Sequence, residues 1–132
     1  MSFELTLLGW ALVLALVHIA LAAGVANKDS GLKFNLGSRD GPAAPISTLG
    51  GRLRRAQANL FETLPLFAAA ILIAHATARE NALTQLGAEL FLGARIAYLP
   101  LYAAGVPVVR TLAWTVSIVG LVLVLVAILR PA

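Results

Sequence analysis

Three polar residues of the kind that bind charged ligands lie close together in one stretch of the chain. Arg55, Asn59 and Glu62 follow one another at intervals of four and three residues, so on an α-helix they share one face. The residues that follow them are largely apolar as far as Ala76. A carboxylate about 10 Å along such a helix is costly in a bilayer. We therefore expect this polar face to bind a ligand or another charged group.

A second set of polar residues lies further along the chain. Arg95, Tyr98 and Tyr102 recur at intervals of three and four residues, which places them on one face if the helix continues past Pro100. Tyrosines near a membrane interface are ordinarily part of the aromatic belt. If they face the first set instead, the two sets form a polar pocket that opens to the cytoplasm. Arg95 is also predicted at the depth of Glu62, so a structural ion pair between them is the alternative.

The composition places the chain among membrane proteins. Of its 132 residues, 60% are hydrophobic and 12% are charged, whereas soluble domains are about half apolar and a quarter charged. There is no cysteine, so the chain has neither disulfides nor a thiol nucleophile of its own. His18 and His75 lack metal-ligand spacing, and we expect interhelical hydrogen bonds from them and no metal site. The net charge of +4 comes mostly from one loop, which indicates membrane topology rather than nucleic-acid binding.

Four segments are predicted to form transmembrane helices in a single domain of residues 1–132. At about 1.5 Å per residue, the first of them is long enough to cross a hydrocarbon core about 30 Å thick. A loop of residues 27–51, rich in glycine and proline, separates the first two segments, and Pro65 is expected to kink the second. The predicted fold is an all-α membrane protein, a bundle of four helices at about residues 3–26, 53–76, 82–99 and 108–129.

The distribution of basic residues predicts the orientation of the chain. Six basic and two acidic residues lie between positions 27 and 55, and loops with an excess of lysine and arginine lie on the cytoplasmic side. Both termini should then be periplasmic, with Arg52 and Arg54 at the level of the lipid phosphates. We expect the bacterial inner membrane, because the chain is short and carries no retention signal.

Two of these segments resemble the signatures of a known family. The stretch Arg55-Ala-Gln-Ala-Asn59-x-x-Glu62-x-x-Pro65-Leu-Phe67 is similar to the helix-two signature of the MAPEG family, the membrane-associated proteins in eicosanoid and glutathione metabolism. The later Ala94-Arg95-Ile-Ala-Tyr98-x-x-x-Tyr102 resembles its helix-three signature. The resemblance implies a homotrimer that binds glutathione between subunits near the cytoplasmic face. Carried over position by position, the glutathione contacts would be Arg55, Asn59, Glu62, Arg95, Tyr98 and Tyr102.

The chemistry of glutathione suits these residue types. Glutathione carries two carboxylates and one ammonium group, so its site needs fixed cations and one carboxylate. The planar guanidinium fork of arginine recognises carboxylates, and Glu62 is expected to take the ammonium. The sequence departs from the leukotriene-conjugating members at Thr63, where they have tyrosine. Their thiolate-stabilising arginine has one nearby candidate here, Arg110, which we take as the expected catalytic residue because a nearby cation lowers the pKa of a thiol.

Two functions of different classes follow. The first is a glutathione-dependent membrane transferase or peroxidase, which acts on lipophilic electrophiles or lipid hydroperoxides that enter from the bilayer. The second is a non-catalytic membrane protein that binds a lipid or another small anionic ligand in the same cleft between subunits. In an organism that uses another low-molecular-weight thiol, the site would serve that compound. Arg110 distinguishes the two functions in the sequence, because only the enzyme needs a cation beside the sulfur.

Overall fold

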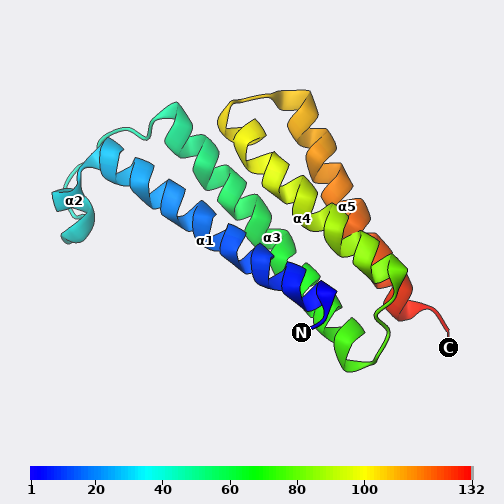
Figure 1. Cartoon of the computed structure of the whole chain (residues 1–132). Coiled ribbons are helices and arrows are strands. Elements are labelled where there is room, and N and C mark those ends of the chain that lie inside the picture. Colours follow the sequence, from blue (N-terminus) through cyan, green and yellow to red (C-terminus); the bar gives the residue numbers. More distant parts are fainter. Residues whose placement is uncertain (132) are drawn as a thin grey trace.

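The chain is helical throughout its regular elements (Figure 1). The computed structural model describes residues 1–131, and in this range it contains five helices and no strand. The prediction of an all-α fold is therefore confirmed. In chain order the helices are α1 (Phe3–Ser30), α2 (Leu32–Leu36), α3 (Thr48–Ala76), α4 (Ala82–Ala103) and α5 (Pro107–Leu129).

Three of the helices are long and apolar enough to cross a membrane, namely α1, α3 and α5. The prediction of a membrane protein is thus supported, but the prediction of four spans is supported for three of them. Helix α4 has 22 residues and is long enough to cross a membrane, but its mean hydropathy is lower than that of the three spanning candidates. It contains Gln85, Glu89 and Arg95, and such residues are strongly unfavourable at the centre of a membrane helix.

The loop predicted for residues 27–51 is shorter than expected and contains α2. Helix α1 continues to Ser30 rather than residue 26, and it ends before Gly31, which adopts the positive φ of 86° that glycine tolerates. Helix α3 begins at Thr48 rather than residue 53, because the Ser47 hydroxyl accepts a hydrogen bond of 3.0 Å from the Gly50 amide. The polar residues at the end of α1 and at the start of α3 are therefore helical, although they lie outside the predicted membrane segments.

Two prolines lie inside helices without ending them. Pro65 lies in α3 and Pro100 lies in α4. Each removes one backbone hydrogen-bond donor, yet α4 continues to Ala103 instead of ending at residue 99. Tyr102 consequently belongs to the same helix as Arg95, so one continuous helix positions both side chains. Helix α5 starts with Pro107 at its first position, where the missing amide is least costly.

The helices pack in two close pairs, α4 with α5 and α1 with α3. Glycines allow the first pair to approach closely: a Cβ atom built on Gly87 would lie 2.5 Å from the carbonyl oxygen of Gly120, and the reverse holds for Gly120. Stacked rings of Phe67 and Phe91, with centroids 4.1 Å apart, join α3 to α4. The site described below lies where these two pairs meet.

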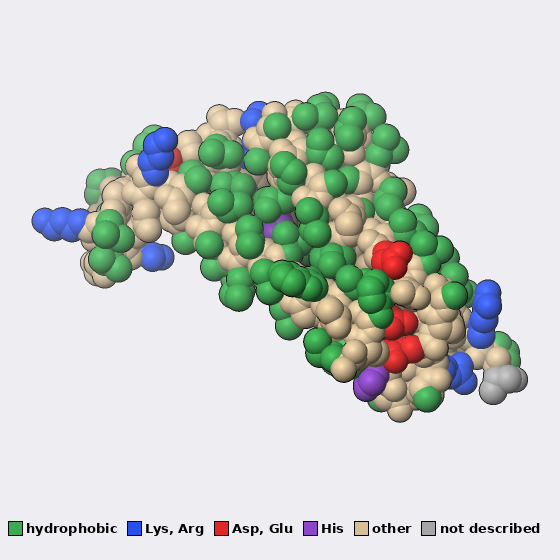
Figure 2. All heavy atoms as spheres, in the orientation of Figure 1, with side chains coloured by type: hydrophobic (Ala, Val, Ile, Leu, Met, Phe, Trp, Pro, Cys, Tyr) green, Lys and Arg blue, Asp and Glu red, His purple; other side chains and the backbone are tan. Residues whose placement is uncertain are grey.

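The two ends of the bundle differ in which segments they hold. Figure 1 shows both termini at the end that contains the turn between α3 and α4, whereas α2 lies at the opposite end. Between the ends, hydrophobic side chains cover much of the face seen in Figure 2. Large apolar residues such as Trp10, Leu72 and Leu112 are exposed on this chain. Such a surface requires lipid or another protein to cover it.

Candidate functional site

Side chains from α3, α4 and α5 converge on Tyr102. The Arg55 Nε group on α3 donates a hydrogen bond of 3.0 Å to the Tyr102 hydroxyl on α4. From the start of α5, the guanidinium carbon of Arg110 lies 4.6 Å from the centroid of the Tyr102 ring, within the range of a cation–π contact. The structure therefore brings together three of the residues that the sequence predicts for the site.

A cavity of about 200 Å³ adjoins this cluster. Its lining combines an amide, two phenols, a guanidinium, a hydroxyl and an indole. The ring centroids of Tyr98 and Tyr102 are 5.4 Å apart, so the two phenols form one edge of the cavity. Hydrogen-bond donors dominate this set, and such a set favours an anionic or strongly polar ligand. The lining residues are Asn59, Tyr98, Tyr102, Arg110, Thr111 and Trp114.

Arg95 lies behind the cavity rather than in its lining. It is 1% exposed, and its guanidinium donates to the Asn59 side-chain oxygen at 2.6 Å and to the Thr63 hydroxyl at 2.9 Å. The rings of Phe91 and Tyr98 lie 5.7 and 5.2 Å from its guanidinium carbon. Its Nε is buried without a partner. In this chain Arg95 therefore fixes the orientation of Asn59.

Glu62 lies outside this cluster. Its side chain is exposed on the surface of the single chain and does not line the cavity. The alternative prediction of an ion pair between Glu62 and Arg95 is wrong, because the one ion pair within residues 1–131 joins His75 and Glu80. The physical reason is the rotation of α3. Thr63, about 100° further round the helix, faces α4 and takes the Arg95 contact instead.

Several residues near the site were not predicted. Thr63 lies four positions after Asn59 and Trp114 lies four positions after Arg110, so helical periodicity alone could have placed them on the same faces. Arg52 gave no such signal: its guanidinium donates at 3.3 Å to the carbonyl of Ala103 at the end of α4. This bond holds the turn between α4 and α5 against α3.

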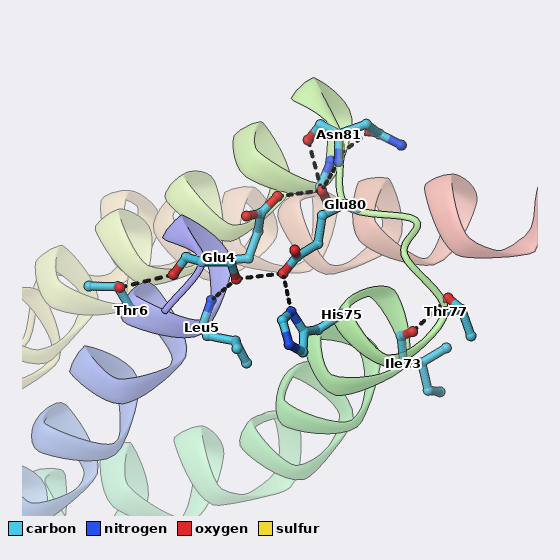
Figure 3. A network of polar contacts seen from close by, with 10 residues as sticks. Glu4, Leu5, Thr6, Ile73, His75, Thr77, Glu80 and Asn81 are labelled. Carbon is cyan, nitrogen blue, oxygen red and sulfur yellow. Dashed lines mark hydrogen bonds and ion pairs between the residues drawn. The ribbon is translucent and has the colours of Figure 1, made fainter.

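A separate polar network lies at the end of the bundle that holds the termini (Figure 3). The carboxylate of Glu4 is buried and accepts a hydrogen bond of 2.7 Å from the Thr84 hydroxyl. The Glu80 carboxylate accepts a bond of 2.6 Å from Ser2 and lies 3.3 Å from Nδ1 of His75. The hydrogen bond from Ser2, with a smaller contribution from His75, holds the pKa of Glu80 below its usual range. This network fastens the N-terminus to the turn between α3 and α4.

The contacts of the two histidines differ from the interhelical hydrogen bonds that were predicted for them. The contact of His75 is with Glu80 in the turn that directly follows α3, so it is local rather than a bond between two helices. His18 is buried in α1, and its Nδ1 has no hydrogen-bond partner within the described residues. No group of three or more His, Cys, Asp or Glu side chains among residues 1–131 is arranged to hold a metal ion.

Comparison with known proteins identifies one family. The model of the MAPEG family matches residues 7–130 of the 132-residue chain. No curated protein and no solved structure gives a significant match. The matched range includes α2 to α5 in full and every residue of the cavity lining.

Proposed function

The chain belongs to the MAPEG family, and on this premise we propose that it is a glutathione-dependent membrane enzyme. Its reaction is either the addition of glutathione to lipophilic electrophiles or the reduction of lipid hydroperoxides. The observation that supports this proposal best is the cluster at Tyr102, where Arg55, Arg110 and a cavity meet. Two guanidinium groups beside one small cavity suit a ligand that carries carboxylates and a thiolate.

Each of the expected contacts has a distinct role in this proposal. Arg55 binds a carboxylate of glutathione through the guanidinium nitrogens that Tyr102 does not use. Asn59 and Tyr98 donate hydrogen bonds from the cavity wall, and Glu62 takes the ammonium group. Tyr102 keeps both arginines in place. Arg95 acts mainly as a positioning residue, because its Nη1 and Nη2 already donate to Asn59 and Thr63.

The size of the cavity supports a site that is shared between subunits, as in the proposed homotrimer. A cavity of about 200 Å³ is smaller than the roughly 300–1,000 Å³ typical of pockets for ligands of drug size. Glu62 lies on the surface beyond its lining. A neighbouring subunit that packs against this surface would enlarge the site and enclose Glu62. We therefore propose that glutathione binds between subunits.

Arg110 is the proposed catalytic residue. Its positive charge lowers the pKa of the glutathione thiol and stabilises the thiolate. In the transferase reaction the thiolate sulfur adds to the electrophilic carbon of an activated double bond: the C–S bond forms, the π bond breaks, and the carbanion that results takes up a proton. In the peroxidase reaction the sulfur attacks the terminal oxygen of the hydroperoxide, which releases an alcohol and leaves a sulfenic acid. A second glutathione then converts the sulfenic acid to a disulfide and water.

The experiment compares the pH dependence of conjugation in wild type, Arg110→Met and the control Arg54→Met, which lies outside the cavity. A thiol with a pKa of about 8.5 is roughly 3% ionised at pH 7, whereas one with a pKa near 6.5 is about three-quarters ionised. We expect Arg110→Met to be about 25-fold slower at pH 7 and to approach wild type near pH 9.5. Glutathione binding without any conjugation in wild type would instead favour the non-catalytic alternative.

We further propose that α4 crosses the membrane in addition to α1, α3 and α5, which gives four crossings. The segment between α1 and α3 is then cytoplasmic and both termini are periplasmic, in a bacterial inner membrane. The excess of basic residues between positions 27 and 55 supports this orientation. Protease should reach tags at both termini from the periplasmic side and should not reach a tag placed near residue 38. Protection of one terminus alone would contradict an even number of crossings.

A further inference from the structure

Another hollow lies away from the site at Tyr102. It is open to the surface beside α2, has a volume of about 490 Å³, and is formed by the end of α1 and the segment between α1 and α3. Its lining contains Lys33, Arg39 and the single carboxylate of Asp40, together with hydroxyl groups of Ser30 and Ser38. The remaining lining residues are Gly31, Phe34, Gly37 and Gly41. Two cations and one carboxylate leave this hollow with a net positive charge.

Hydrogen bonds hold the segment around this hollow in place. The side-chain amide of Asn35 donates to the Ala26 carbonyl at 3.1 Å and to the Asn27 side chain at 2.9 Å, which fastens α2 to the end of α1. The carboxylate of Asp29 accepts bonds from the amide and the hydroxyl of Ser47 at 3.1 and 2.8 Å. This second contact ties the end of α1 to the start of α3 and occupies Asp29 within the protein.

The cations near α2 form no ion pair within residues 1–131, where the one ion pair is at the opposite end of the bundle. The side chains of Lys28, Lys33 and Arg39 are all exposed. Arg39 also adopts a positive φ of 61°, where glycine or asparagine is more favourable than arginine. Its Nε donates to the Asn35 carbonyl at 3.0 Å, which directs the guanidinium back over α2.

The same helix exposes an apolar face. Leu32 is 56% exposed and Leu36 is 77% exposed, and their spacing of four residues places them on one side of α2. Figure 2 shows basic side chains projecting next to hydrophobic ones around this end of the molecule. Leucines on one side of a short helix, with Lys33 on the helix and Arg39 three residues after its end, suit a segment that lies in a membrane interface.

The length of α1 places α2 at the level of the lipid head groups. Its 28 residues extend about 42 Å, whereas the hydrocarbon core is about 30 Å thick. The polar residues Asn27–Ser30 therefore extend beyond the core, and α2 follows them directly. We propose that the hollow beside α2 binds the head group of an anionic phospholipid, with Lys33 and Arg39 on the phosphate and Leu32 and Leu36 among the acyl chains. This proposal does not depend on the glutathione site.

The test is a lipid titration of the delipidated full-length protein in a neutral detergent, followed by native mass spectrometry. The probes are phosphatidylglycerol and phosphatidylcholine. We expect one phosphatidylglycerol to bind per chain more tightly than any phosphatidylcholine. Since each basic contact near a membrane surface contributes about fivefold, the double variant Lys33→Gln/Arg39→Gly should weaken this binding by about 25-fold. Glycine at position 39 suits the positive φ, so this change should not disturb folding.

The matched control is Arg54→Gln, which removes a cation from the start of α3 outside the hollow. A neutral micelle has no anionic surface, so this variant should bind phosphatidylglycerol within about twofold of wild type. Equal binding of the two lipids, or unchanged binding in a double variant with a normal melting temperature, would overturn the proposal. Competition by soluble glycerol 3-phosphate at a concentration equal to that of the lipid would overturn it in favour of a soluble anion.

Discussion

The contacts of Arg95 predict a specific energetic coupling between α3 and α4. We consider the variants Asn59→Ala and Thr63→Val, each of which removes one acceptor of the Arg95 guanidinium. A hydrogen bond to a charged group contributes about 1.5–3 kcal/mol, whereas interhelical hydrogen bonds in membrane proteins average about 0.6 kcal/mol. Because Arg95 is 1% exposed, we expect each substitution to lower the free energy of unfolding by about 1.5–3 kcal/mol.

The double variant should be less stable than either single variant, because Nε of Arg95 already lacks a partner and the guanidinium would then have no acceptor. A buried charge without partners destabilises a protein by about 3–5 kcal/mol. Arg95→Met introduced into the double variant should therefore restore several kcal/mol, since an apolar side chain of similar length needs no acceptor. Such a rescue is a result that a merely space-filling Arg95 would not produce.

The assay is reversible unfolding of the purified protein in mixed micelles, with helicity as the readout. Thr63 also donates a bond of 3.1 Å to the Leu60 carbonyl, so its loss must be separated from that of the Arg95 contact. Thr115→Val is the matched control, because Thr115 makes the same kind of bond within α5 and is exposed. Losses below about 0.6 kcal/mol at both positions, or no rescue by Arg95→Met, would refute this account of Arg95.

Three further predictions concern other parts of the chain. Gly87→Ala should destabilise the protein by about 1–3 kcal/mol in the same unfolding assay, because its methyl group would meet a carbonyl oxygen of α5 at 2.5 Å; Gly93→Ala, with open space around it, should be neutral or stabilising by up to about 1 kcal/mol. Glu80→Gln should speed hydrogen exchange at the amides near Ser2 at pH 7, and the difference from wild type should disappear at acidic pH. The sign follows from the lowered pKa of Glu80: the tether is complete above the ordinary glutamate pKa of about 4.3 and is lost as the pH falls through the lower folded value. Tyr102→Phe keeps the aromatic ring but removes an acceptor of arginine, so glutathione affinity measured by calorimetry should fall about fivefold, and unchanged affinity would contradict the proposed role of the hydroxyl.

Helical spacing in the sequence placed Tyr98 and Tyr102 on one face of a helix, and both line the cavity. A pocket between the two predicted polar faces was one of two alternatives, and a hydrogen bond joins Arg55 of the first face to Tyr102 of the second. Spacing does not specify how each helix is rotated about its axis relative to its neighbours. For this reason Glu62 was predicted beside Arg95, whereas the packing of α3 on α4 presents Thr63. Attraction between opposite charges was a weaker constraint than the burial of the apolar faces.

The segment between α1 and α3 was also predicted incompletely. Glycines and prolines between residues 31 and 45 indicated a loop, and five residues of α2 are too few to show a helical period. The cap by Ser47 could have been predicted, since serine is a common N-cap residue. The bonds from Ser47 to Asp29 across 18 positions could not, because they depend on how α1 and α3 are placed together.

The close contact between α4 and α5 has a consequence for the insertion of the proposed fourth crossing. The eight leucine, isoleucine and phenylalanine residues of α4 favour transfer into the bilayer by about 2–5 kcal/mol in total, whereas Arg95 and Glu89 together oppose it by roughly 5–7 kcal/mol. Helix α4 therefore has little tendency to leave the translocon alone. Its partner α5 is strongly apolar and packs against it through Gly87 and Gly120. The two helices should enter the membrane together as a hairpin, so α4 must wait near the translocon until α5 has been synthesised.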